Sequence, residues 1–180
     1  MTNIKVSINC FFESLDTVKF KCSENSIDHK VHNNFIVFRK KIVYTIFRSK
    51  DLNKNHVNIT GIKSYGNLKY AVDFLGSIGI IVDNTTLKVD NITGSLNLGR
   101  EVFLQSLINK IQLEKSYTNE IIINNNNETF PGAFLKVQKD SIKIGTIIVF
   151  HSGKVVFVGC RNLENLKCLE SLILVLTQTR

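Results

Sequence analysis

Thiols and imidazoles are the side chains here that most readily do chemistry, but their spacing does not favour catalysis or metal binding. The four cysteines form no C-x-x-C pair and have no histidine at zinc-site spacing: they are Cys10, Cys22, Cys160 and Cys168. The four histidines form no recognisable ligand set: His29, His32, His56 and His151. The sequence also lacks paired carboxylates, a phosphate-cradling glycine loop and a triad signature. It therefore predicts reduced core thiols, no cofactor, no metal and no enzymatic activity.

Amide and aromatic side chains are more informative, because they recur in two parts of the chain. The segment Asn3–Asn9 returns 88 residues later as Asn91–Asn97, with Asn, Ile and Asn at matching places. Thr45–Ser49 is likewise matched by Ile148–Ser152. After each of these lies a predicted strand that ends in glycine and a basic residue, at residues 57–63 and 155–161. This spacing favours two copies of one unit, residues 1–79 and 86–180.

The elements that must position these side chains follow one order in both halves: strand, helix, several strands, helix. In the second half we expect strands near 87–93, 132–139, 144–150 and 154–159. Apolar periodicity predicts the closing helices at about 65–75 and 162–176. Strands joined by short turns indicate an antiparallel sheet with helices on one face, an α+β fold.

Composition sets the broad class of protein. The 180 residues carry a net charge of +8, with 43% hydrophobic and 21% charged residues, as in a globular protein that suits a polyanionic partner. Neither a membrane-spanning run nor a signal peptide is seen, so we expect no membrane contact and no secretion. Ile, Lys and Asn make up 60 residues, which indicates an AT-rich genome.

Two predicted strands are apolar on both faces, at residues 147–150 and 155–158. Helices on one side of an antiparallel sheet cover only one of those faces. The second face either packs on a further layer or forms an exposed apolar interaction surface.

Phe130-Pro131-Gly132, followed by the segment Ile148–Gly159, resembles the second half of the TATA-binding protein core. Asp90–Ser95 resembles the opening strand of that half, and the first half of the chain resembles the family core more weakly. The resemblance implies a saddle of two pseudo-symmetric repeats, with a curved ten-stranded antiparallel sheet and helices on the convex face. The concave face would bind and bend the DNA minor groove. The chain starts almost at the first saddle strand, so we expect a core without an N-terminal extension.

The resemblance also implies roles for individual residues. Asn3 and Asn91 would donate hydrogen bonds to minor-groove acceptors. Phe130 and Phe150 would be wedges between base steps. The rest of the expected second-half surface comprises Thr93, Pro131, Ile148, Ser152, Val156 and Val158. Phosphate contacts would come from Arg39, Lys63, Lys136, Lys154 and Arg161.

The first half departs from the family pattern. Phe47 matches one wedge, but Asn33 stands where its partner is expected, with Phe35 as a substitute two residues later. The other departures on the expected groove face are Lys5, Asn58 and Thr60. These changes weaken the expectation of intercalation on the first side and of a TATA preference.

These observations predict a TATA-binding-protein-like initiation factor that binds AT-rich double-stranded DNA and nucleates a preinitiation complex. The resemblance implies a transcription factor IIB-like partner, contacted through Glu128, and the RNA polymerase machinery. Composition suggests a virus or protist, and hence the nucleus or a cytoplasmic viral factory or virion. A protein-interaction scaffold of the same fold is the alternative, and an accessory domain of a nucleic-acid enzyme is a third.

Overall fold

The computed structural model describes residues 2–51, 55–113, 120–124 and 130–178, which form two compact units divided between Asp90 and Asn91. The elements of the first unit are β1 (Thr2–Phe11), α1 (Leu15–Glu24), β2 (Asp28–Val31), β3 (Phe35–Arg39), β4 (Val43–Phe47), β5 (His56–Ile62) and α2 (Tyr65–Ser77). Strand β6 (Ile81–Asn97) begins in the first unit and ends in the second. The second unit continues with α3 (Leu104–Leu113), β7 (Glu120–Asn124), β8 (Gly132–Lys139), β9 (Ile142–Phe150), β10 (Lys154–Cys160) and α4 (Leu163–Thr177).

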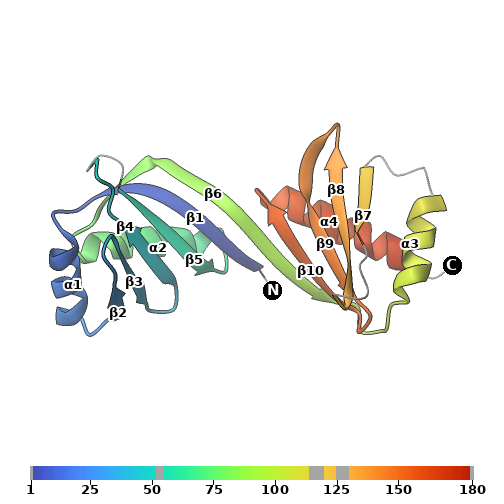
Figure 1. Cartoon of the computed structure of the whole chain (residues 1–180), viewed down its shortest axis with the longest axis horizontal. Coiled ribbons are helices and arrows are strands. Elements are labelled where there is room, and N and C mark those ends of the chain that lie inside the picture. The colour runs from blue at the N-terminus through green and yellow to red at the C-terminus, as the bar shows by residue number, and fades with distance from the viewer. Residues whose placement is uncertain (1, 52–54, 114–119, 125–129, 179–180) are drawn as a thin grey trace. The chain divides into compact units, whose positions relative to one another are not determined.

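The sheet pairing confirms the α+β class and the antiparallel sheet. In the first unit the hydrogen-bonded order is β2-β3-β4-β5-β1-β6, and in the second it is β6-β10-β9-β8-β7. The strand registers are antiparallel, as for β8 on β9 and β4 on β5. The order strand, helix, four strands, helix is therefore present in both units (Figure 1). No observation tests the repeat boundaries 1–79 and 86–180, which stay a prediction.

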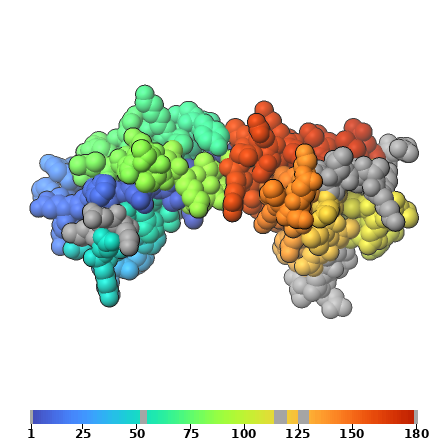
Figure 2. Space-filling view, turned by 90° about the horizontal axis from the view of Figure 1, so that it is seen from above, coloured from blue at the N-terminus to red at the C-terminus, as the bar shows by residue number. Residues whose placement is uncertain are grey.

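Each unit buries one sheet face under helices. Helix α2 packs on β5, and α4 packs on β9 and β10 (Figure 1). Figure 2 shows α4 in red along one side of the second unit. In β1 the covered face carries Ile4, Val6, Ile8 and Cys10, each at most 1% exposed. These apolar residues alternate with polar neighbours, which is the pattern of a strand with one covered face.

Helix boundaries follow from local capping. Ser14 precedes α1, and its side chain accepts a hydrogen bond from Thr17 N at 3.0 Å. Asn162 precedes α4 and accepts from Asn165 N at 2.7 Å. Such caps satisfy backbone N–H groups that have no partner within the helix. The predicted helices at 65–75 and 162–176 are present within a residue or two, as α2 and α4, whereas β6 is much longer than the expected strand at 87–93.

Three cysteines are core residues. Cys10, Cys22 and Cys160 are buried free thiols, and Cys168 is half-buried. Burial raises the pKa of the Cys10 thiol to about 12 and those of Cys22 and Cys160 to about 11. A thiol with so high a pKa is a poor nucleophile at neutral pH. Among the described residues, no group of three or more His, Cys, Asp or Glu could hold a metal, and no helix is long and apolar enough to cross a membrane.

Candidate nucleic-acid interface

The sheet face that points away from the helices carries the predicted binding residues. We call the part in the first unit the first open face: Asn3, Lys5, Ser7, Asn9, Phe35, Val37, Arg39, Val43, Thr45, Phe47, His56, Asn58 and Thr60. The second open face, in the second unit, comprises Asn91, Thr93, Ser95, Phe134, Lys136, Thr146, Ile148, Phe150, Lys154, Val156 and Val158. Most of these side chains are half-buried or exposed, and they alternate along each strand with fully buried ones.

An aromatic cluster lies at the edge of the second open face. The ring centroids of Phe130 and Phe150 are 5.7 Å apart, and Phe134 lies 4.7 Å from Phe130. Gly132 pairs with Phe150 in the sheet, and a Cβ placed on it would lie 3.0 Å from the Phe130 ring and 2.9 Å from Val149 O. The absence of a side chain at Gly132 therefore lets the Phe130 ring lie close to the strand, as the Phe-Pro-Gly sequence indicates.

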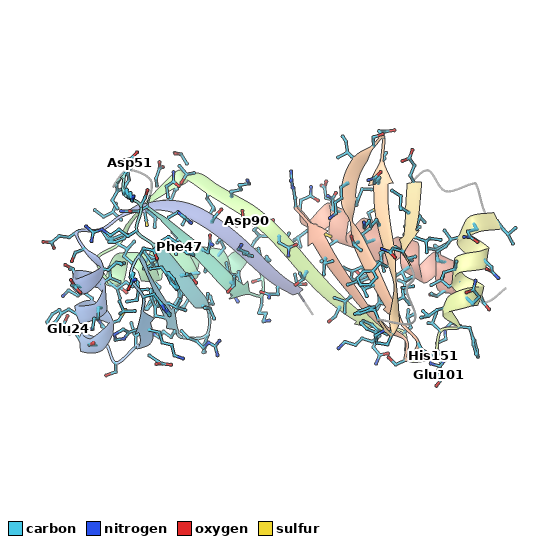
Figure 3. All side chains as sticks on the ribbon, viewed as in Figure 1. Glu24, Phe47, Asp51, Asp90, Glu101 and His151 are labelled. Atoms are coloured by element: carbon cyan, nitrogen blue, oxygen red, sulfur yellow. The ribbon has the colours of Figure 1, made fainter. Side chains whose placement is uncertain are left out.

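A second aromatic pair lies on the first open face. Phe35 and Phe47 are register partners on β3 and β4, with ring centroids 5.6 Å apart (Phe47 is labelled in Figure 3). Phe35 is in register with Phe47 as Gly132 is with Phe150, so Asn33 stands at the place of Phe130, as expected, and Phe35 meets Phe47 from two residues further along. The first unit therefore has the paired rings that its sequence made uncertain.

Two histidines extend this pair into a stack of four rings. His32 stacks on Phe35 at 4.3 Å and 19°, and His56 stacks on Phe47 at 4.8 Å and 15°. Neither histidine was among the residues expected on this surface. Pairing of the two strands would have placed His56 beside the expected wedge, because His56 is the register partner of Phe47. Among the described residues, the ring partners of Phe130 and Phe150 are phenylalanines.

The two predicted asparagines have the same backbone environment. Asn3 Oδ1 accepts a hydrogen bond from Gly61 N at 2.9 Å, and Asn91 Oδ1 accepts one from Gly159 N at 2.9 Å. Both glycines have positive φ, 95° and 79°, at points where the strand register shifts. Glycine adopts this conformation without a steric penalty. Because each carbonyl oxygen is held by the backbone, the amide orientation is fixed and Nδ2 is directed elsewhere.

The central rows of the two open faces differ in polarity. On the second face, cross-strand partners form the row Ser95, Val156, Ile148 and Phe134. On the first face, the corresponding row is Ser7, Asn58, Thr45 and Val37. The next row on the second face is Val158, Thr146 and Lys136. The corresponding row on the first face is Thr60, Val43 and Arg39. The apolar floor expected from Ile148, Val156 and Val158 is thus confined to the second face, and the first is more polar.

The predicted cations lie around these rows. Lys136 is exposed on β8, Lys154 begins β10 and Arg39 ends β3. Lys63 and Arg161 are exposed, each two residues beyond its positive-φ glycine.

Two of the remaining predicted residues flank the strands of the second open face. Ser152 is exposed in the turn that Gly153 N closes on Phe150 O at 3.0 Å, and Pro131 links Phe130 to β8. Glu128, the predicted partner-binding residue, lies outside the described residues. The structure gives the positions of these side chains and does not test their DNA contacts, which stay predictions.

An acidic residue that the sequence did not single out reaches the first open face. Asp90 Oδ1 accepts a hydrogen bond from Ser7 Oγ at 3.0 Å, and Oδ2 lies 3.8 Å from Lys5 Nζ. Lys5 is therefore not a solitary cation on this surface, because Asp90 offsets its charge.

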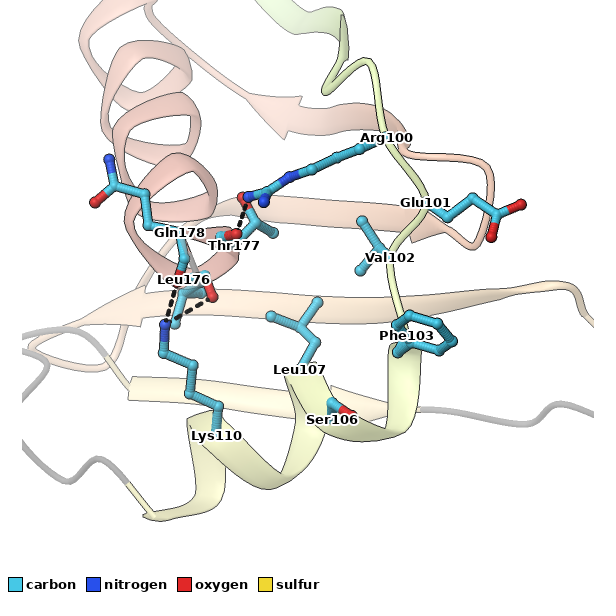
Figure 4. A pocket seen from close by; sticks show the side chains of 10 residues that line it. All are labelled: Arg100, Glu101, Val102, Phe103, Ser106, Leu107, Lys110, Leu176, Thr177 and Gln178. Carbon is cyan, nitrogen blue, oxygen red and sulfur yellow. Dashed lines mark hydrogen bonds between the residues drawn. The ribbon is translucent and has the colours of Figure 1, made fainter. Parts of the chain in front are cut away.

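The pocket in Figure 4 belongs to the second unit and lies between α3, the C-terminal end of α4 and residues 100–103. Its volume is about 330 Å³. The two cations that line it, Lys110 and Arg100, donate to the last carbonyls of α4: Lys110 Nζ to Leu176 O and Gln178 O at 3.1 Å each, and Arg100 to Thr177 O. These cations therefore cap a helix C-terminus, a structural role.

Comparisons with known proteins agree with the arrangement. A sequence model of the family described as transcription factor TFIID (or TATA-binding protein, TBP) matches residues 86–175. The TATA-box-binding proteins of Pyrobaculum islandicum and Methanococcus aeolicus are each 30% identical to this chain, over 46% and 69% of its residues. The chain spans only 35% and 62% of the length of these relatives. The solved structure of Methanococcus jannaschii TBP is similar with a TM-score of 0.66 and 25% identity, covering 97% of this chain and 94% of that one.

Proposed function

Because this chain belongs to the TATA-binding protein family, we propose that it is a transcription initiation factor whose two open faces bind the minor groove of AT-rich DNA. The observation that carries the proposal is the pair of asparagines, Asn3 and Asn91, each held by its carbonyl oxygen to a bulge glycine. The N–H groups of such an amide are hydrogen-bond donors. Adenine N3 and thymine O2, the minor-groove atoms of A·T pairs, are acceptors.

The polarity of the second open face suits the same ligand. Ile148, Val156 and Val158 form an apolar floor that can pack against the sugars and base edges of a widened minor groove. A guanine amino group placed on that floor would lose water without gaining a partner, at a cost of about 1–3 kcal/mol. This supports a preference for A·T pairs at the second open face.

We further propose that both aromatic pairs act as wedges. Phe130 with Phe150, and Phe35 with Phe47, each present two rings at the edge of an open face. Inserting such rings unstacks a base step, at a cost of roughly a few kcal/mol, and kinks the duplex so that more protein surface contacts it. The duplex would thus bend at two steps, one for each pair.

The same proposal includes a place in a larger assembly. Bent promoter DNA would be joined by a transcription factor IIB-like protein, through Glu128, and by an RNA polymerase. The AT-rich coding bias supports a viral or protist source. The protein would then act in the nucleus or in a cytoplasmic viral factory. No catalytic step is part of this proposal.

Fluorescence anisotropy with AT-rich and GC-rich duplexes, repeated across a salt series, tests the proposal. We expect tighter binding to the AT-rich duplex and a steep salt dependence, because log K falls by about 0.9 per phosphate neutralised for each unit of log salt. The five predicted phosphate-binding cations would contribute to that slope, and Lys154→Gln should reduce it. Binding to neither duplex would overturn the proposal and favour the protein-interaction scaffold.

A further inference from the structure

Asp90 is an acidic side chain on a surface that otherwise suits a polyanion. It lies on β6 (Figure 3), next to β1 in the strand order of the first unit, and 25% of its side chain is exposed. We propose that Asp90 is a specificity-determining residue, which accepts a hydrogen bond from the exocyclic amino group of a guanine. One position in the DNA site would then take a G·C pair. This inference rests on the proposed function.

The chemistry of the minor groove leads to this assignment. An ionised carboxylate is only an acceptor, with about four lone-pair sites on its two oxygens. An A·T pair presents only acceptors in the minor groove, so it offers Asp90 no hydrogen bond. A G·C pair adds the guanine N2 amino group, which is a donor and lies near the middle of the groove. Guanine is therefore the base that satisfies a carboxylate on this surface.

The contacts of Asp90 leave it able to accept such a bond. Ser7 Oγ donates to Oδ1 at 3.0 Å, which fixes the orientation of the carboxylate. Lys5 Nζ is 3.8 Å from Oδ2, which is too long for a hydrogen bond but close enough to offset the negative charge. The repulsion between Asp90 and the phosphates of a bound duplex is therefore reduced. Both carboxylate oxygens keep lone pairs that can accept a hydrogen bond.

The neighbouring residues restrict the expected preference for G·C to one position of the DNA site. Asn91 follows Asp90 directly, and Asn3 precedes Lys5 by two positions on β1. Both asparagines are amides with Nδ2 oriented by a glycine contact, and they favour acceptors. The site should therefore prefer A·T pairs where the asparagines contact it and a G·C pair at the position that Asp90 faces. A uniform AT tract would not be its best ligand.

A base-pair scan with the unaltered protein tests the inference. Each position of an AT-rich duplex is replaced in turn by G·C and by inosine·C, which lacks the amino group, and the dissociation constant is measured. At one position G·C should bind about tenfold tighter than inosine·C, the size of effect typical of a hydrogen bond to a charged group. At the other positions inosine·C should bind as tightly as G·C or tighter.

Two matched variants assign the effect to Asp90. Asp90→Asn removes the charge but keeps the size and an acceptor for Ser7, and it should abolish the advantage of G·C at that position. Asp83→Asn removes the same charge from the same strand, where Asp83 Oδ1 accepts from Thr85 N at 3.0 Å and from Thr85 Oγ1 at 2.6 Å, and it should keep the advantage. Thermal melting confirms that both variants fold.

The outcomes separate this inference from the proposed function. Binding to AT-rich DNA with no position that favours G·C over inosine·C overturns the role of Asp90 alone. The same result follows if the favoured position persists in Asp90→Asn. Failure to bind any duplex overturns the proposed function together with the inference.

Discussion

Gly159 donates its backbone N–H to Oδ1 of Asn91 at 2.9 Å, and the same bond joins Gly61 to Asn3 in the other unit. The two asparagines are 88 residues apart in sequence, yet each amide is oriented by a glycine of positive φ on the neighbouring strand. The repeated geometry gives the carbonyl oxygen a structural role, and the proposed function assigns a binding role to the amide nitrogen.

The amide nitrogen is tested by Asn91→Asp, which keeps an oxygen for Gly159 N–H but removes the donor. We expect the dissociation constant for an AT-rich duplex to rise at least tenfold, because a donor is lost and a carboxylate faces base acceptors. Asn97→Asp on the same strand, where Asn97 Oδ1 accepts from Gly99 N at 3.0 Å, adds the same charge as a control. Equal weakening by both variants would assign the effect to charge.

The first aromatic pair is tested by Phe35→Ala. If Phe35 and Phe47 wedge together, this variant should reduce DNA bending, measured by energy transfer between labelled duplex ends, as strongly as Phe150→Ala does. Asn33→Ala, which removes the residue at the position expected from sequence, should leave bending close to that of the unaltered protein. Bending that depends on Phe150 but not on Phe35 would confine the kink to the second unit.

The histidine stack is tested by His56→Ala. Stacked rings contribute about 0.5–1.5 kcal/mol beyond their buried area, so the free energy of unfolding in urea should fall by at least that amount. His151, whose ring makes only an edge contact with Phe103 at 6.0 Å, is the control. His151→Ala should change the free energy of unfolding less; the reverse order would mean that the stack adds nothing to stability.

The close approach at Gly132 is tested by Gly132→Ala. The new methyl group would lie 2.9 Å from Val149 O, a backbone atom that cannot move cheaply, and 3.0 Å from the Phe130 ring. We expect destabilisation of about 1–3 kcal/mol and reduced bending of DNA. Gly76→Ala in α2 meets nothing within 4 Å and should stabilise the protein by up to about 1 kcal/mol. Similar results for both would argue against crowding at Gly132.

The buried thiols predict a loss of stability at alkaline pH. Burial raises the pKa of the Cys10 thiol from 9.0 to about 12, so unfolding exposes a group that ionises more readily. The stability contributed by the neutral thiol is complete below pH 9 and falls as the pH rises from 9 toward 12. Cys10→Ala should flatten this part of the stability profile in urea titrations between pH 8 and pH 10.5. An unchanged slope would mean that the pKa of Cys10 is the same in the folded and unfolded states.

The sequence by itself determined the α+β class, the strand–helix order and the location of the second open face. Alternating apolar residues indicate which face of β1 is covered, and Phe130-Pro131-Gly132 indicates a ring folded over a glycine. These features are local, because strand periodicity, helix capping and turn chemistry depend on residues a few positions apart. The repeated asparagines were visible as well, because their spacing is a property of the chain.

Only the tertiary structure decided which side chains meet. Phe35, rather than Asn33, faces Phe47 because the register of β3 on β4 depends on where each strand begins. Asp90 meets Ser7 although they are 83 residues apart, and His32 reaches the same stack as His56 across three strands. A shift of one residue in register would turn each of these side chains to the opposite face of the sheet. Local sequence does not set that register, because it comes from long-range pairing that buries the apolar face under the helices.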